Sequence, residues 1–126
     1  MELPELIVGC ITLTALIAHV LIGTRETAAL KPDDSHLTTH WVQAMSAFQM
    51  LSVDLLVVCV LLFAIAIFDL GPIEPALVLL LAALFLLWGL VWILQTLWLQ
   101  REFRALLRLP HWLVWFFCSG LLFWAA

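Results

Sequence analysis

The chain has few charged residues. Lys, Arg, Asp and Glu make up 11% of its 126 residues, whereas 66% of the residues are hydrophobic. An ordinary soluble domain is about half apolar and about a quarter charged, and a domain this small keeps much of its surface in water. The composition therefore excludes an ordinary soluble domain and predicts an integral membrane protein with lipid as part of its solvent.

Basic residues are especially scarce. Five Lys and Arg stand against nine Asp and Glu, the net charge is −4, and no basic patch is interleaved with aromatic residues. These features argue against nucleic-acid binding. The sequence also lacks a GxSxG motif, a P-loop and a GxGxxG motif. It therefore gives no indication of the enzyme activities that depend on those motifs.

Cysteine is rare as well, with Cys10, Cys59 and Cys118 scattered through apolar stretches. An odd number of isolated cysteines is no disulfide framework, and we interpret all three as small buried hydrophobic residues. The acidic start Met1–Glu5 has neither the positive charge nor the cleavage site of a signal peptide. We therefore expect the first apolar run to remain as a membrane span.

The apolar runs predict an all-α fold, an integral membrane four-helix bundle that forms a single transmembrane domain over 1–126. A span needs about 20 residues, with a usual range of about 17–25. The last run has only 15 residues, Trp112–Ala126, and covers about 22 Å at 1.5 Å per residue. It could extend back to Arg108 if that side chain snorkels to the interface. The expected spans are about 6–22, 41–68, 76–99 and 108–126.

The basic residues predict the orientation, because all five lie in the loops 23–40 and 100–110. The positive-inside rule places both loops in the cytoplasm, and both termini and the turn 69–75 outside, in what we expect to be a bacterial inner membrane. Within that turn, Gly71 suits the end of the second helix and Pro75 the first turn of the third. Thr38 or Thr39 is the expected cap of the second helix.

Asp54 is the most unusual residue, because it stands where a long apolar run begins. A carboxylate inside a membrane span is costly unless it is paired, hydrated or protonated. His40, Gln43, Met50 and Asp54 fall within one helical sector about 80° wide, which predicts that Asp54 faces other helices and not lipid. This stripe is either a hydrated path or binding groove ending at Asp54, or a polar seam that joins helices.

Gln49 and Ser52 point away from this stripe and are expected to bond across to other helices.

His19 and His40 are expected at similar depth in an antiparallel hairpin, near Glu26 in the loop between them. Three interpretations remain open. A divalent metal could bind His19, His40 and a carboxylate such as Glu26 or Asp54; a haem could take two axial histidines; or the histidines bond to backbone or water at the interface. No compact spacing selects a metal, so the cofactor remains unknown.

Two of the seven tryptophans lie well inside a span. Trp88, Trp92 and Gln95 share a face about 60° wide on the third helix. They indicate either aromatic packing, with indole N–H groups bonded to Gln95 or Ser119, or an aromatic wall for a cation with Asp54 as counter-charge. The remaining tryptophans of interest fit aromatic belts at the two interfaces: Trp41, Trp98, Trp112 and Trp124.

Two functions of different classes follow. The first is a small oligomeric transporter or channel, with a protonatable or cation-binding site around Asp54, His40 and His19. The second is a non-catalytic accessory or scaffold subunit of a larger membrane complex, in which the polar seam joins helices. A haem-binding electron-transfer subunit is a third possibility.

Overall fold

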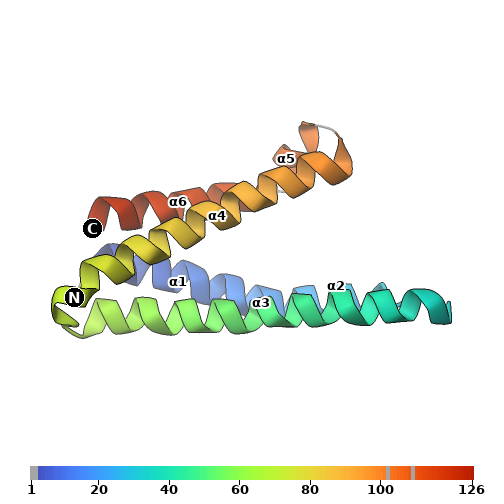
Figure 1. Cartoon of the computed structure of the whole chain (residues 1–126), viewed down its shortest axis with the longest axis horizontal. Coiled ribbons are helices and arrows are strands. Elements are labelled where there is room, and N and C mark those ends of the chain that lie inside the picture. Colours follow the sequence, from blue (N-terminus) through green and yellow to red (C-terminus); the bar gives the residue numbers. More distant parts are fainter. Residues whose placement is uncertain (1–2, 102, 109) are drawn as a thin grey trace. The chain divides into compact units, whose positions relative to one another are not determined.

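The computed structural model describes residues 3–101, 103–108 and 110–126. Within these ranges all regular structure is helical, which confirms the predicted all-α class. The chain order is α1 (Leu3–Ala18), the π-helix η1 (His19–Gly23), α2 (Thr24–Ala29), α3 (Ser35–Ile67), the 3-10 turn η2 (Gly71–Ile73), α4 (Glu74–Gln100), α5 (Arg104–Arg108) and α6 (His111–Ala125). Figure 1 labels the six α-helices.

Three of the helical segments are long and apolar enough to cross a membrane: Leu3–Ala29, Ser35–Ile67 and Gly71–Gln100. The first combines α1, η1 and α2 without a break. α3 has 33 residues and is about 50 Å long, well beyond the ~30 Å hydrocarbon core of a bilayer. At least one end of α3 therefore extends past the core of any membrane that it crosses.

The fourth apolar helix is shorter than a usual span. α6 has 15 residues and begins at His111, directly after Pro110. Arg108 ends the separate helix α5, so α6 itself does not extend back to Arg108. Three described helices, not four, thus have the length and composition of a membrane span.

The chain divides into two compact units, one formed by Gly9–Ala64 and the other by the segment ending at Val8 together with Ile65–Ala126. The first unit is an antiparallel hairpin of the long first helix and α3 (Figure 1). Gly9 lets the two helices approach closely, because a Cβ there would lie 3.3 Å from the Phe63 ring. Near the same point, the Cys59 thiol donates a 3.8 Å hydrogen bond to the Gly9 carbonyl.

The second unit is organised around the antiparallel pair α4 and α6. At Gly89 of α4, an added Cβ would lie 2.8 Å from the Phe116 ring of α6. A second contact lies one turn after Phe116 on α6 and two turns before Gly89 on α4. There, the Ser119 hydroxyl donates a buried 2.8 Å hydrogen bond to the Ala82 carbonyl. Small residues let membrane helices approach closely, and hydroxyl groups bond across them.

Local chemistry explains the ends of the helices. The Asp34 carboxylate accepts the backbone N–H of His36 at 2.8 Å and so caps α3. The expected cap at Thr38 or Thr39 is wrong, because α3 begins earlier, at Ser35. Gly71 has a φ of 64° and donates its N–H to the Asp69 carboxylate, but the expectation that it ends the second helix is wrong, because α3 already ends at Ile67. Pro75 lies in the first turn of α4, as predicted.

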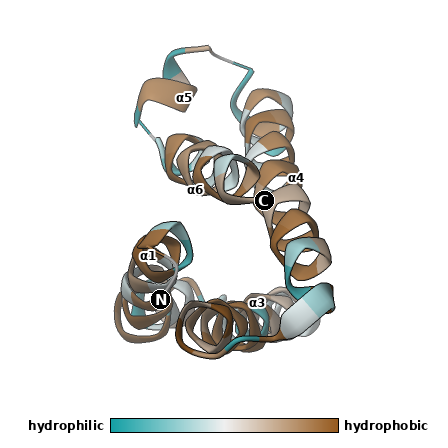
Figure 2. Ribbon diagram, turned by 90° about the vertical axis from the view of Figure 1, so that its left-hand side faces the viewer, coloured by the Kyte–Doolittle hydropathy of each residue, from teal (hydrophilic) through white to brown (hydrophobic). Residues whose placement is uncertain are grey.

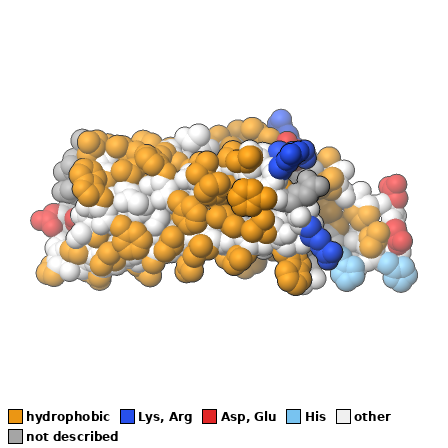
Figure 3. All heavy atoms as spheres, turned by 90° about the horizontal axis from the view of Figure 1, so that it is seen from above, with side chains coloured by type: hydrophobic (Ala, Val, Ile, Leu, Met, Phe, Trp, Pro, Cys, Tyr) orange, Lys and Arg blue, Asp and Glu red, His pale blue; other side chains and the backbone are white. Residues whose placement is uncertain are grey.

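Much of the apolar side-chain surface is not covered by the chain itself. Large hydrophobic residues are exposed along every long helix, including Leu80 at 65% and Leu94 at 66%. Figure 2 shows that the helices consist mostly of hydrophobic residues, and Figure 3 shows hydrophobic side chains spread over most of the face in view. Lipid or other proteins would have to cover such a surface.

Candidate functional site

A chain of polar side chains lies inside the hairpin, where the first helix widens into the π-helix η1. The Gln49 amide of α3 donates a 3.0 Å hydrogen bond to the Thr24 hydroxyl. Thr24 in turn donates to the His19 carbonyl at 3.4 Å, and Ser52 donates to the Gln49 amide oxygen at 3.4 Å. The prediction that Gln49 bonds across to another helix is confirmed, whereas Ser52 bonds to Gln49 on its own helix.

His19 belongs to this inner side of the hairpin. Its Nε2–H donates to the Phe48 carbonyl at 3.0 Å, and its ring stacks on the Phe48 ring with the centroids 3.9 Å apart. This bond occupies Nε2, so that only Nδ1 is left to bind a metal or a haem iron. The structure therefore gives His19 a packing role between the two helices.

The predicted stripe lies on the opposite, outer side of α3. His40, Gln43, Met50 and Asp54 are all exposed, so they share a face as expected. Within the hairpin, the first helix does not cover this side of α3, so the prediction that Asp54 faces other helices and not lipid stays a prediction. The sequence could not distinguish a helix of the same chain from a partner outside it.

The metal candidates are not gathered into one place. His40 and Asp54 are 14 residues apart on one helix, which is about 21 Å. Glu26 is exposed on α2. Among the residues that the structure describes, no three His, Cys, Asp or Glu side chains form a group that could hold a metal ion.

The tryptophans of α4 are in contact with other aromatic rings. Trp88 makes edge contacts with Phe85 and Trp115, each with centroids 5.4 Å apart. Trp92 lies against the His111 ring at 4.7 Å. These contacts favour the interpretation that Trp88 and Trp92 serve in packing over the interpretation that they form a wall for a cation.

Gln95 and Ser119, the expected hydrogen-bond partners of the indole N–H groups, are placed differently. Ser119 donates to the Ala82 carbonyl, and Gln95 is exposed. The Trp92 Nε1–H is buried and has no hydrogen-bond partner among the described residues. A small hollow of about 190 Å³ lies beside it, lined by Trp92, Gln95, Thr96, Leu99 and Gln100.

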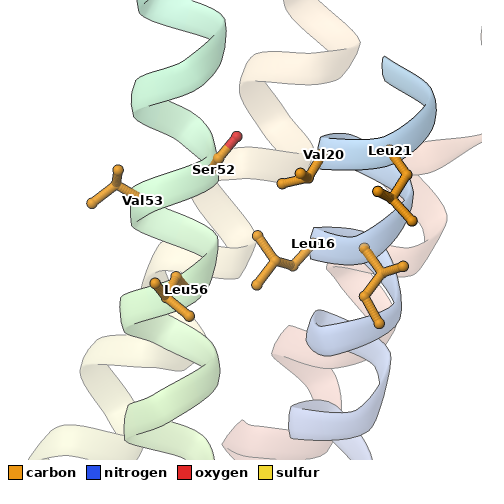
Figure 4. Close-up of a pocket in the computed structure, with 7 residues that line it drawn as sticks. Leu16, Val20, Leu21, Ser52, Val53 and Leu56 are labelled. Carbon is orange, nitrogen blue, oxygen red and sulfur yellow. The ribbon is translucent and has the colours of Figure 1, made fainter. Parts of the chain in front are cut away.

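A larger apolar groove lies on the hairpin next to the π-helix. It has a volume of about 430 Å³ and is lined by Leu16, Ile17, Val20, Leu21, Ser52, Val53 and Leu56 (Figure 4). Ser52 supplies its only side-chain hydroxyl. Asp54 does not line the groove, because a turn of about 100° per residue directs it away from Ser52 and Leu56.

Glu5 is a functional candidate that the sequence interpretation missed. Its side chain is only 2% exposed, and its Oε2 accepts no hydrogen bond from the described residues. We assigned it to an acidic tail outside the first span, but α1 already begins at Leu3. The spacing of Glu5, Val8 and Thr12, all buried, is the signal that could have placed it on an inward helical face.

Comparisons with known proteins identify no relative. No protein family, curated protein or solved structure matches the chain. The function must therefore be argued from the residues themselves.

Proposed function

We propose that the protein is an integral protein of the bacterial inner membrane and works as a non-catalytic subunit of a larger membrane assembly. In this proposal the outer face of α3 contacts a helix of a neighbouring subunit. We call this face the outer seam and define it as Gln43, Ala47, Met50, Asp54 and Val57. The loops 23–40 and 100–110 face the cytoplasm.

The observation that carries the proposal is the exposure of Asp54. The carboxylate lies 13 residues before the end of α3 at Ile67, in a stretch where every following residue is apolar. Placing a charged side chain at the centre of a membrane helix costs about 2.5–3.5 kcal/mol on insertion scales. A neighbouring helix that supplies a hydrogen-bond donor would offset that cost.

The inner side of the hairpin provides a contrast. There, Gln49, Thr24 and His19 find their hydrogen-bond partners within the chain. The polar side chains of the outer seam have no such partner among the described residues. The hairpin thus satisfies the groups it encloses and leaves one polar face for a contact outside it.

The spacing of the outer seam also suits a partner helix. Its members follow one another at intervals of four, three, four and three residues, and all are exposed. This 3.5-residue period is the pattern by which two helices pack along a common seam. Ala47 would allow a close approach, as small residues do between membrane helices.

Site-specific photo-crosslinking in native membranes tests the proposal. Val57 lies on the outer seam and Leu56 lies off it, yet both are 51% exposed, so they form a matched pair. We expect a crosslinker at Val57 to capture one discrete protein and a crosslinker at Leu56 to capture none. Equal capture at both positions, or capture at neither, would contradict the proposal.

A homo-oligomeric transporter is the second candidate. The exposure of His40, Gln43 and Asp54 on one face favours it, because several copies could turn that face toward a shared cation path. Crosslinking at Val57 between two copies, together with loss of cation flux in vesicles on Asp54→Asn, would select it. Unchanged flux in that variant would eliminate it.

A further inference from the structure

We infer that the neighbour at the outer seam is a different protein, and that its transmembrane helix carries a Lys or Arg side chain opposite Asp54. This inference rests on the proposed function and names the chemistry of the partner. It follows from three features: the charge of Asp54, the distribution of basic residues in this chain, and the geometry of a seam between parallel helices.

A second copy of the chain does not supply the required charge. All its Lys and Arg lie at positions 25, 31, 101, 104 and 108, and none lies between 32 and 100. Two copies inserted in the same direction would pair their seams residue against residue, so that Asp54 meets its own counterpart. Two carboxylates at one site disfavour each other's charge, so one of the two would have to take up a proton, and neither would meet a positive charge.

A basic side chain meets the chemical need of Asp54 directly. An ionised carboxylate only accepts hydrogen bonds, whereas Lys and Arg only donate them. A hydrogen bond between two opposite charges is also stronger than one between neutral groups. The unbranched Met50 beside Asp54 can adjust its shape to the long apolar stem of such a side chain.

The inference can be tested with synthetic helices. We would reconstitute the purified full-length chain in phospholipid nanodiscs with a 21-residue Leu/Ala peptide that carries one central Lys, and measure binding by energy transfer. Matched peptides carry Leu or Glu at that position. We expect the Lys peptide to bind about 5- to 30-fold more tightly than the Leu peptide, the range that polar contacts between membrane helices give.

Variants locate the effect on the seam. Asp54→Asn keeps the shape of the side chain and should reduce the preference for Lys over Leu to about twofold or less. Asp54→Lys should reverse the preference in favour of the Glu peptide. Moving the carboxylate off the seam, in the double variant Asp54→Asn with Leu56→Asp, should not restore binding of the Lys peptide. If it does, the seam is not the binding face and the inference fails.

Two further outcomes would overturn the inference, and they differ in what they say about the proposed function. Equal binding of all three peptides would show that charge does not select the partner. Energy transfer between labelled copies that is lost in Asp54→Asn, with no effect of the Lys peptide, would identify a second copy as the partner. The latter result would leave the outer seam as an interface, whereas the absence of crosslinking at Val57 in cells would refute the interface itself.

Discussion

Replacing Gly89 with alanine should destabilise the pair of helices α4 and α6. A Cβ at this position would lie 2.8 Å and 3.0 Å from two atoms of the Phe116 ring, closer than carbon atoms normally approach. Gly120 on α6 provides the matched control, because a Cβ added there meets nothing within 4 Å. The two substitutions therefore differ in crowding and not in chemistry.

The expected magnitude follows from two opposing terms. Exchanging Gly for Ala inside a helix favours folding by about 0.8–1.0 kcal/mol at either position. Overpacking of a close contact costs about 1–3 kcal/mol, and applies only to Gly89. Gly89→Ala should therefore be less stable than Gly120→Ala by about 1–3 kcal/mol.

The assay is equilibrium unfolding in mixed detergent micelles with increasing sodium dodecyl sulfate, followed by tryptophan fluorescence. Trp88 and Trp115 lie next to each other across the pair and should report its separation. In a Phe116→Leu background, where the ring is absent, the two alanine variants should become equally stable. If Gly89→Ala and Gly120→Ala match in the wild-type background, the close approach of α4 and α6 is wrong.

Three other predictions test the hairpin, the buried acid and the orientation. Gln49→Leu should lower the free energy of unfolding by about 0.5–1.5 kcal/mol, because it removes a bond to Thr24, whereas Gln43→Leu on the outer seam should leave the isolated chain unchanged. An equal loss in both would refute the contrast between the two sides of α3. Glu5→Gln should unfold no more easily than the wild type, since the buried Oε2 has no hydrogen-bond partner among the described residues. A loss above about 3 kcal/mol in the same assay would reveal a buried ion pair. Single cysteines at Asp34 and Asp69, in a cysteine-free chain, should react with an impermeant maleimide from the cytoplasmic and the outer side respectively. Labelling of both from one side would refute the orientation.

Hydrophobic length was sufficient to predict the three long apolar helices. Pro75 lies in the first turn of α4, where the sequence placed it, whereas Gly71 has a positive φ in the 3-10 turn η2 and does not end α3, which stops at Ile67. The ends were harder to predict. Asp34 lets α3 begin at Ser35, because its carboxylate accepts the backbone N–H of His36, one of the free N–H groups of the first turn.

Periodicity placed residues on faces but could not say what each face contacts. It grouped Met50 with Asp54 and separated Gln49 from them, as the structure has it. It could not show that the first helix covers the side of α3 that carries Gln49 and leaves the side of Asp54 open. The side that is covered depends on the close approach of the two helices at Gly9 and on the stacking of His19 on Phe48. Contacts between residues distant in sequence leave no mark on the pattern of a single helix.

The central claim is that the outer seam of α3 is an interface with another subunit. The most direct measurement is a tryptophan scan over positions 43–61, with partner recovery quantified after gentle solubilisation. We predict that recovery falls with a period of about 3.5 residues, with minima at Ala47, Met50, Asp54 and Val57 and little change at Leu56 or Val60. Recovery that is uniform along the scan, or that falls only at positions facing the first helix, would contradict it.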